Sequence, residues 1–517
     1  MAERDFIITP DLATNPPTNV RGQNDFRYPN GRLAPQECEI LENLNLTEQG
    51  TAKKRKGYRP WNSSQISEGG VKAITGLFQA TYKAGTRQIE MAGTKVYADD
   101  GTTRKDITGS LTLTDHAENR WRSVFLQNQL IATNGTDETV TWGGDFTTPT
   151  AASALSGVPW STCADLVVHR NVLLALNTTE SGTNHPTRVR WCDIDKRVLT
   201  VDVTSWPADN RAEVYHDGTQ IVGGVDGFDR LVLFKTDGLY PCVLEYDTGF
   251  IELRILPPQR GFSPVARHSI LSHPQFLWVV ARDGGYLVRP DFSFELVTRK
   301  VQHTWNTLNK GRLQYAVSFL REQDHQVRTL LSSENNTSGH DLMMVFDWET
   351  GDVWFDKPTD TLNYASRYII SDEEFDWLGS TDGYVLQGNT GTTDNSSDVN
   401  WDIKMSPNDL GYPGRSKSIT NFVTLYESQR GSQSVNFVAT LDQGNLPSRS
   451  TSLSLGTTLQ YDSSPASTYD AGLTYPTEQT AEDSFFINRV CQTIAPRWSG
   501  SGDFELVGYK VDFTVLE

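Results

Sequence analysis

A short apolar run, a turn and a second apolar run recur along the middle of the chain about every 45 residues. Each run is β-branched or aromatic and only about four to seven residues long, which is too short for a helix and typical of a strand. In the clearest copies the turn is Asp-Gly, a pair that supplies the positive φ angles of a tight hairpin. Each clear copy therefore predicts a β-hairpin. The clear copies are Arg230–Tyr240, Phe276–Tyr286 and Phe375–Leu386.

Weaker copies of this pattern fill the intervals and bring the total to about seven units. They are Gln88–Tyr97, Trp121–Gly135, Val167–Leu176 and Thr329–Trp354. About 45 residues can form the four strands of one propeller blade, and roughly six to eight blades close a ring without a long open edge. The repeat predicts a β-propeller of about six to eight blades over residues 61–395. A β-sandwich or a β-solenoid with accidental periodicity is the alternative.

The two flanks of the repeat have a different pattern. Prolines interrupt residues 1–60, which predict an extended docking arm with one short helix at 35–45. A polar, turn-rich linker follows the repeat. Beyond it, residues 396–517 contain alternating runs at 417–426 and 434–442, which predict a hairpin in a small C-terminal β-sandwich. The sequence as a whole predicts an all-β protein.

Composition agrees with this fold class. The 517 residues include 41 Gly, 13 Trp and 18 Tyr but only 5 Met, a bias toward turn and strand formers. The five cysteines are dispersed without a CxxC pair, so we expect buried free thiols. Because no signal-peptide pattern and no run of about 18 apolar residues occurs, we expect synthesis in a reducing cytoplasm and no membrane span.

The formal net charge of −18 lies mainly on the repeat, with +1 on residues 1–60, −13 on 61–395 and −6 on 396–517. Such acidity argues against an ordinary nucleic-acid binder, whose affinity depends on Lys and Arg at phosphates. It is compatible with a surface that DNA passes without binding. It is equally compatible with charge that only keeps a large β-rich protein soluble.

One concentrated basic run interrupts this acidity, at residues 53–59. It has two interpretations: an electrostatic contact with DNA phosphates or with an acidic adaptor protein, or a solvated strand that leads into the first blade. The candidate contact residues are Lys53, Lys54, Arg55, Lys56 and Arg59.

Motifs for catalysis or metal binding are lacking. The sequence has no phosphate-binding loop, HExxH pair, GxSxG elbow or EF-hand, and its nine histidines are scattered. The segment Asp347–Trp354 loosely resembles the Asp-, Gly- and Trp-containing turn of sialidase blades, but it does not recur cleanly. We therefore expect no enzyme, no cofactor and no metal.

Two segments beside the basic run resemble the opening of tail proteins from short-tailed bacteriophages. They are Gly31–Asn45 and Lys54–Pro60. The family is called tail nozzle, tail tubular protein B or packaged-DNA stabilisation protein. Its plan of an N-terminal arm, a β-propeller body and β-rich platform or tip elements is similar to the plan predicted for this chain.

The resemblance implies a structural virion protein in the phage tail. Such proteins form a ring, usually a hexamer, that retains genomic DNA and then conducts it during ejection. The implied partners are further copies of the chain, a tail adaptor, tail fibre or spike proteins, and passing double-stranded DNA. An acidic lumen between subunits would repel phosphates. The chain has little room for the large inserted domains of longer members, so the resemblance does not extend to a specialised closing gate.

Two other functions stay open. A receptor- or glycan-binding propeller predicts aromatic side chains exposed in a pocket, with Trp278, Trp354 and Trp377 as candidates. A glycoside hydrolase, the less favoured of the two, predicts two carboxyl groups about 5 to 10 Å apart in a shared cleft.

Overall fold

The computed structural model of the protein describes residues 4–8, 20–25, 34, 36–47, 50–62, 64–83, 85–100, 102–146, 151–195, 200–214, 218–247, 250–427, 432–442, 444–445, 449–454 and 481–516. The chain divides into two compact units, each built mainly from antiparallel strands. The propeller unit comprises Tyr58–Gly351 and Pro358–Asn389. The sandwich unit comprises Met1–Gly57, Asp352–Lys357 and Thr390–Glu517.

The first three sheets of the propeller unit follow one another along the chain. Blade 1 contains β6 (Ile74–Tyr82), β7 (Gly85–Ala92), β8 (Lys95–Asp99) and β9 (Arg104–Asp106). Blade 2 contains β10 (Arg122–Leu126), β11 (Gln129–Thr133), β12 (Val140–Trp142) and β13 (Ser153–Ala154). Blade 3 contains β14 (Thr162–His169), β15 (Val172–Glu180), β16 (Thr183–Trp191) and β19 (Arg211–Glu213), with the inserted hairpin β17 (Asp193–Asp195) and β18 (Thr200–Asp202).

Four further sheets complete the unit. Blade 4 contains β20 (Ile221–Gly227), β21 (Arg230–Lys235), β22 (Gly238–Asp247), β23 (Phe250–Ile255) and β24 (Gln259–Arg260). Blade 5 contains β25 (Leu271–His273), β26 (Phe276–Val280), β27 (Gly285–Val288) and β28 (Phe294–Leu296). Blade 6 contains β29 (Val317–Arg321), β30 (Gln326–Leu331) and β31 (Leu342–Asp347). Blade 7 contains β33 (Leu362–Ile370), β34 (Glu373–Ser380), β35 (Val385–Gly388) and β5 (Tyr58–Pro60).

Short helical turns separate some of these strands. They are η1 (Arg267–Ser269), η2 (Val297–Val301), α1 (Gln302–Asn306) and η3 (Lys310–Tyr315). Among the residues that the structure describes, no helix is long and apolar enough to cross a membrane.

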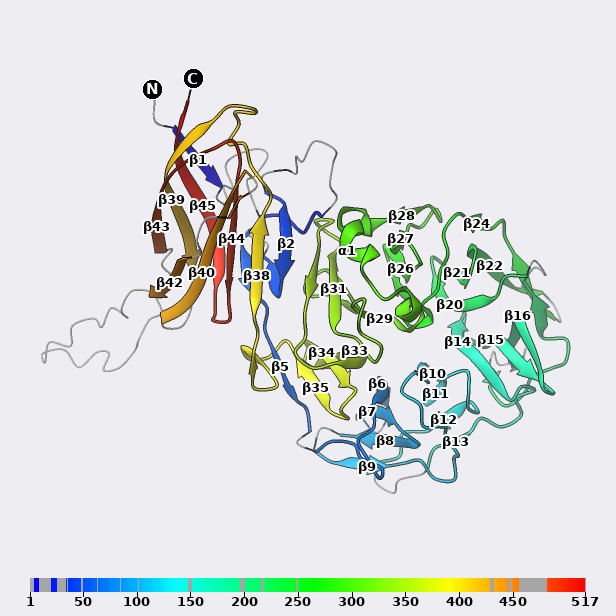
Figure 1. Ribbon diagram of the computed structural model, residues 1–517. Coiled ribbons are helices and arrows are strands. Elements are labelled where there is room, and N and C mark those ends of the chain that lie inside the picture. The colour runs from blue at the N-terminus through cyan, green and yellow to red at the C-terminus, as the bar shows by residue number, and fades with distance from the viewer. Residues whose placement is uncertain are drawn as a thin grey trace, which may run out of the picture. The chain divides into compact units, whose positions relative to one another are not determined.

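The seven sheets close into a ring (Figure 1). The first strand of each blade contacts the first strand of the next, and β33 of blade 7 contacts β6 of blade 1. Blade 7 takes its outer strand from the opposite end of the unit, because β5 pairs with β35 through Pro60 opposite Leu386 and Tyr58 opposite Gly388. This pairing leaves no open edge between the first and last blades. Within the described residues the predicted propeller is confirmed, and it has seven blades.

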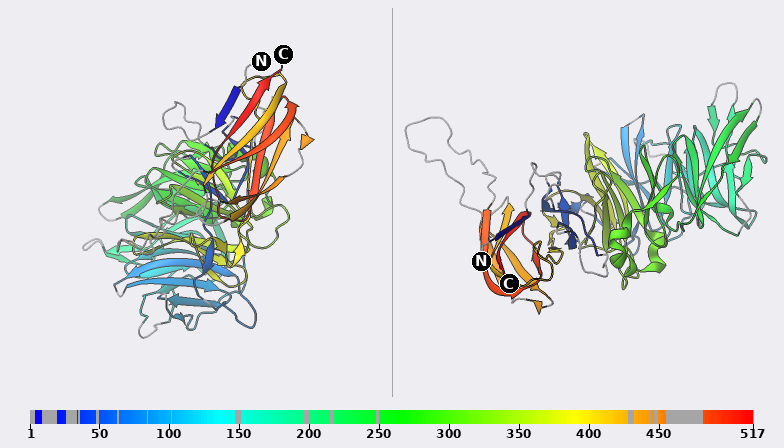
Figure 2. Two further views of the ribbon diagram at one scale, coloured as in Figure 1. Left: turned by 90° about the vertical axis from the view of Figure 1, so that its left-hand side faces the viewer. Right: turned by 90° about the horizontal axis from the view of Figure 1, so that it is seen from above.

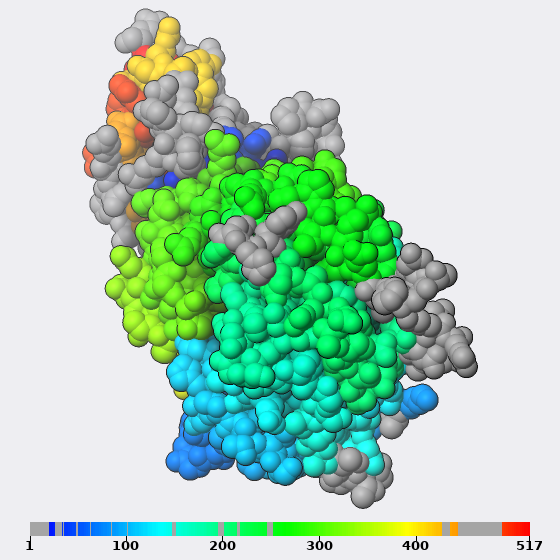
Figure 3. Space-filling model, turned by 90° about the vertical axis from the view of Figure 1, so that its right-hand side faces the viewer, coloured from blue at the N-terminus to red at the C-terminus, as the bar shows by residue number. Residues whose placement is uncertain are grey.

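Each of the seven predicted repeat copies begins in a different blade, although the copy Thr329–Trp354 ends in β32 of the sandwich unit. The three clear copies are hairpins. Gly383 shows why the turns need glycine: its φ is 75°, and a Cβ there would lie 2.7 Å from the Ile66 carbonyl oxygen. Because blades 1 to 6 are each a contiguous segment, the colour changes in successive bands across the propeller surface in Figure 3.

Large side chains fill the spaces between blades. Trp278 of blade 5 stacks on Phe346 of blade 6 with ring centroids 5.5 Å apart. Tyr82 of blade 1 meets Trp142 of blade 2 edge to face at 5.2 Å. Full burial of one such apolar side chain contributes about 1.5–3 kcal/mol. The aromatic bias of the sequence therefore serves packing between blades.

The sandwich unit consists of two facing sheets. The first contains β43 (Ala481–Cys491), β39 (Lys417–Glu427), β45 (Glu505–Val515), β1 (Arg4–Ile8), β4 (Ala52–Lys54) and β3 (Leu44–Leu46). The second contains β32 (Val353–Asp356), β2 (Cys38–Glu42), β38 (Trp401–Met405), β44 (Ile494–Gly500), β40 (Ser432–Leu441), β41 (Gly444–Asn445) and β42 (Arg449–Ser454). A short hairpin pairs β36 (Thr393–Asp394) with β37 (Ser397–Asp398).

The predicted C-terminal β-sandwich is confirmed, and strands from the N-terminal residues complete it. Figure 2 shows the blue strand β1 beside the red strand β45, with which it pairs in antiparallel register. Phe422 of the first sheet meets Phe437 and Trp498 of the second, with ring centroids 4.8 and 5.8 Å apart. These contacts form an aromatic core between the sheets.

The short helix predicted at 35–45 is wrong, because the described residues of this segment form β2 and β3. A β-bulge between Cys38 and Ile40 explains the error. Cys38 and Leu41 are both fully buried, and the bulge places these two residues three positions apart on the same face. The resulting spacing imitates the period of a helix.

The hairpin predicted from 417–426 and 434–442 is also wrong. β39 pairs with β43 and β45, whereas β40 pairs with β44, β41 and β42 in the other sheet. Alternating polarity identifies both strands, but it does not say which sheet each one joins. The linker predicted at 388–397 contains the division between the two units at Asn389 and Thr390, and it also carries the β36–β37 hairpin.

Candidate functional site

The basic run is engaged mainly inside the sandwich unit. Lys53 Nζ lies 3.0 Å from Glu505 Oε2. Lys54 is buried, donates a hydrogen bond of 2.6 Å to the Ser501 carbonyl, and has its pKa lowered by burial. Neither ammonium group extends freely into solvent as a docking patch would require.

Arg55 is also buried, and it makes a two-pronged ion pair with Asp394. Its Nη1 and Nη2 donate to the two carboxylate oxygens at 2.8 and 2.5 Å, while Nε donates to Asn43 Oδ1 at 2.9 Å. Lys56 and Arg59 are exposed, and Arg59 donates to Gln387 Oε1 at 3.3 Å. The run therefore offers two exposed cations, one in each unit, rather than five adjacent ones.

A second group of cations gathers at the inner ring of the propeller, far apart in sequence. We call this group the axial cluster. It consists of Arg120, Arg122, Arg267 and Arg312 with Glu118, Asp165, His268 and His340. Four guanidinium groups thus share two carboxylates, and the cluster has an excess of positive charge.

One half of the axial cluster is organised by Glu118. Its two carboxylate oxygens accept from Arg120 Nη1 and Arg312 Nη1, both at 2.7 Å. Arg120 is fully buried, also donates to Asn363 Oδ1 at 2.7 Å, and has its pKa lowered by burial to about 10. Both guanidinium groups lie over the Tyr315 ring, 5.2 and 5.3 Å from its centroid.

The other half is organised by Asp165, which is fully buried at the inner strand of blade 3. Its carboxylate accepts from Arg122 Nε at 2.9 Å and from the Gly224 backbone N–H at 2.9 Å. Burial raises the pKa of Asp165, and Arg122 and Arg267 oppose that effect. Arg267 donates to the carbonyls of Ala164 and Asn134.

The two histidines of the cluster are neutral at neutral pH. Burial and the neighbouring arginines hold the pKa of His268 and of His340 well below the usual value. His268 Nε2 accepts from Arg267 Nε at 3.4 Å, so the neutral ring carries its proton on Nδ1. That buried Nδ1 has no hydrogen-bond partner. The ring therefore holds an unused donor.

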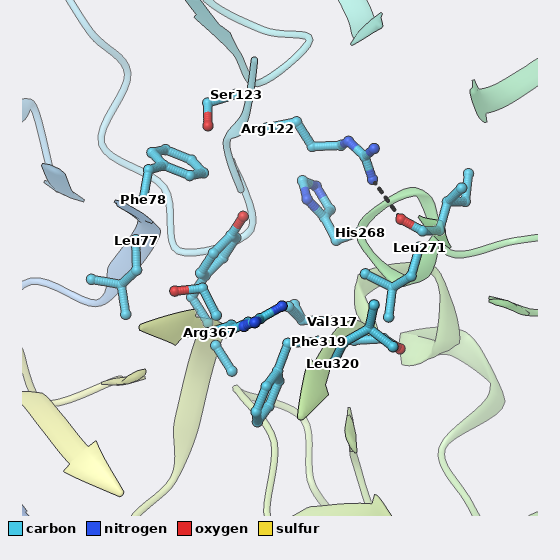
Figure 4. Close-up of a pocket in the computed structure, with 15 residues that line it drawn as sticks. Leu77, Phe78, Arg122, Ser123, His268, Leu271, Val317, Phe319, Leu320 and Arg367 are labelled. Atoms are coloured by element: carbon cyan, nitrogen blue, oxygen red, sulfur yellow. Dashed lines mark hydrogen bonds between the residues drawn. The ribbon is translucent and has the colours of Figure 1, made fainter. Parts of the chain in front are cut away.

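Cavities lie on two sides of His268. The smaller one has a volume of about 320 Å³ and an apolar wall that includes Leu77, Phe78 and Phe319. Figure 4 shows Arg122 beside His268 in this cavity, and its dashed line is the 3.4 Å bond from Arg122 to the Ile270 carbonyl. Arg367 also lines this cavity.

The larger cavity has a volume of about 890 Å³ and is more polar. Its charged lining residues are Glu118, Arg267, Arg282 and Lys310. Lys310 Nζ donates to the Trp305 carbonyl at 2.5 Å, and burial lowers its pKa. Three cations thus face a single carboxylate, which Arg120 and Arg312 already hold.

The residues that the sequence suggested for glycan binding or for glycoside hydrolysis serve packing and turn formation. Trp278, Trp354 and Trp377 are all buried, so the aromatic pocket predicted for a glycan-binding propeller does not involve them. Asp347 Oδ1 accepts from the backbone N–H groups of Glu349 and Thr350 and thereby shapes a turn. No group of three His, Cys, Asp or Glu side chains among the described residues could hold a metal ion.

No family model matches the chain, and no curated protein sequence matches it. Similar solved structures include the WD40 domain of Neurospora crassa Pan2, at 8% identity and a TM-score of 0.38, covering 65% of this chain and 94% of that one. A structure of BBS1N in complex with ARL6DN has 11% identity and a TM-score of 0.39, with coverage of 65% and 97%. A mitotic checkpoint complex has 8% identity and a TM-score of 0.40, with coverage of 65% and 93%. The fold assignment rests on the strand pairing described above.

Sequence reasoning selected the basic run and missed the axial cluster. Its two histidines, His268 and His340, are among the nine that are scattered along the sequence. The positions of these residues along the chain are the available signal: Arg120 and Arg122 lie at the start of the predicted repeat copy Trp121–Gly135, and Arg267 and His268 precede the strand β25.

Proposed function

We propose that this chain is a structural protein of a bacteriophage tail, which assembles into a ring that retains genomic DNA and conducts it during ejection. The observation that carries the proposal is the architecture. The segments that resemble tail nozzle proteins contribute strands to a β-sandwich, and the second of them also contains the closing strand of a seven-bladed propeller. A propeller and a β-rich unit are two of the three parts of the plan that the resemblance implies.

The residues of the two family-like segments are joined to each other. Asn43, with a φ of 57°, accepts from Arg55 Nε through its side-chain oxygen and donates to the Asn400 carbonyl at 2.6 Å. A Cβ at Gly57 would lie only 2.0 Å from the Thr393 carbonyl oxygen. The fold of the sandwich unit therefore requires Asn43, Arg55 and Gly57 at these positions. This supports the view that the short sequence resemblance reflects a shared local structure.

The charge of the chain suits the proposed role. A net charge of −18 disfavours stable binding of DNA phosphates and so favours passage over capture. In this proposal six copies form the ring, the lumen lies between subunits, and a tail adaptor and fibre or spike proteins are the neighbours. Lys56 is the exposed cation that the basic run contributes to the sandwich unit, and we assign it to an adaptor contact.

Electron microscopy of the purified chain, with mass measured by light scattering over a range of concentrations, tests the proposal. We expect a symmetric ring with six times the subunit mass of 57.7 kDa. Its central hole should admit duplex DNA, which requires a diameter of roughly 20 Å or more. A monomer at every concentration would contradict assembly by this chain alone. A closed particle without a hole would contradict the conduit.

A further inference from the structure

We propose that the larger axial cavity of the propeller binds a small polyvalent oxyanion, such as an organic phosphate or a polycarboxylate. This inference does not depend on the proposed tail function. It follows from the charge, the unused donors and the size of the cavity.

The charge of the cavity is opposite to that of the chain. Arg267, Arg282 and Lys310 line it, and its only charged counterpart among the lining residues is Glu118. That carboxylate is already held by Arg120 and Arg312, both at 2.7 Å. Although the net charge of the protein is −18, this local excess of cations attracts an anion to the cavity.

Some donors of the cavity have no partner within the described structure. The exposed Arg282 guanidinium makes no ion pair or hydrogen bond with described residues, although its backbone N–H donates to the Ser263 carbonyl. His268 lines the cavity and carries the unpartnered Nδ1–H. A buried donor without a partner is destabilising, and a bound oxyanion that accepts from it removes that cost. Arginine is also the side chain best suited to two-pronged contact with a carboxylate or phosphate.

The size of the cavity limits the ligand. A volume of about 890 Å³ is within the range of small-molecule sites and far below what a duplex needs. Asn177, Gln220 and Gln314 add amide groups to the lining, and Tyr315 adds an aromatic ring. This mixture fits a compact, polar organic anion better than an extended polymer.

Isothermal titration calorimetry with pyrophosphate and with citrate, at constant ionic strength, tests the proposal. We expect saturable binding of one anion per chain. Arg282→Gln should weaken it about tenfold or more, the loss of one charge-assisted hydrogen bond. A preference for pyrophosphate would assign a phosphate ligand, and a preference for citrate a carboxylate; either result supports the proposal.

Arg289→Gln is the matched control, because Arg289 is an exposed arginine of the same blade that pairs with Glu295 and does not line the cavity. It should change the affinity less than about twofold. Thermal melting of both variants should match the native chain, since both positions are exposed. The proposal is overturned if neither anion saturates at millimolar concentration, or if Arg289→Gln weakens binding as much as Arg282→Gln.

Discussion

The basic run and the larger axial cavity both contain several cations, but these cations have different partners. In the basic run, Lys53, Lys54 and Arg55 are engaged by Glu505, the Ser501 carbonyl and Asp394. In the axial cavity, by contrast, Arg282 extends without a partner among the described residues, and His268 keeps a free donor. A high density of charge along the sequence is therefore a poor guide to the charge that a ligand can reach.

Charge density along the sequence is a poor guide because the partners of a charged residue lie far away along the chain. Arg55 and Asp394 are distant in sequence, so the sequence shows the cation without the carboxylate that neutralises it. Arg120 and Arg267 look isolated in sequence, and only closure of the propeller brings them into one cluster. Local patterns cannot show either pairing, and variants at each site can test the contrast.

The largest effect is expected for Arg120→Met, because this side chain is fully buried and holds Glu118 and Asn363. Removing one partner of a buried ion pair costs about 3–5 kcal/mol. Chemical denaturation followed by tryptophan fluorescence should show that loss in the propeller transition. The exposed Arg289→Met is the control and should cost no more than about 0.5 kcal/mol. Equal losses of stability for the two variants would contradict the claim that the buried Arg120 of the axial cluster stabilises the propeller.

Arg55→Met should have the second largest effect, about 3 kcal/mol, because it leaves the buried Asp394 carboxylate without this guanidinium. A variant that also carries Asp394→Leu should recover more than half of the loss, since neither charge is then buried. The denaturation midpoint of the sandwich transition measures both. If Arg55→Met is as stable as the native chain, the basic run is not engaged internally as described.

A smaller effect concerns pH. The folded state lowers the pKa of His268 and His340, so as pH falls below about 6.5 the unfolded chain binds protons first and stability is lost. Each histidine contributes at most about 1.4 kcal/mol of loss per pH unit. His268→Gln should therefore lose about 1 kcal/mol less than the native chain between pH 6.5 and 5.5, because the unfolded imidazole is only half protonated at the start of this range. Identical pH profiles of thermal melting would contradict the burial of a neutral His268.

The smallest effect is expected for Lys56→Gln and Arg59→Gln, because both side chains are exposed. Each should change stability by no more than about 0.5 kcal/mol. If Lys56 contacts an adaptor, its replacement should instead weaken adaptor binding and reduce the dependence of that binding on salt. A loss of stability at Lys56 or Arg59 as large as that of Arg55→Met would contradict the distinction between these two exposed cations and the buried Arg55.

Most of the propeller could be predicted because its signals are local. The Asp-Gly turn at Asp237–Gly238 and the apolar runs on either side identify a hairpin without any knowledge of its neighbours. Non-local features could not be predicted in this way. The pairing of β5 with β35 joins opposite ends of the propeller, and the bulge at Cys38 disguises a strand as a helix. The same limit applies to the site, because the axial cluster exists only after the ring closes.

Arginine footprinting with phenylglyoxal, read out by mass spectrometry, compares the two regions most directly in a single experiment on the native chain. We predict fast modification of Arg282 and Arg59, slow modification of Arg55 and Arg120, and protection of Arg282 by pyrophosphate while Arg59 stays reactive. Fast modification of Arg55, or an Arg282 that reacts as slowly as Arg120, would contradict the claim that Arg55 of the basic run is engaged internally whereas Arg282 of the larger axial cavity can be reached by a ligand.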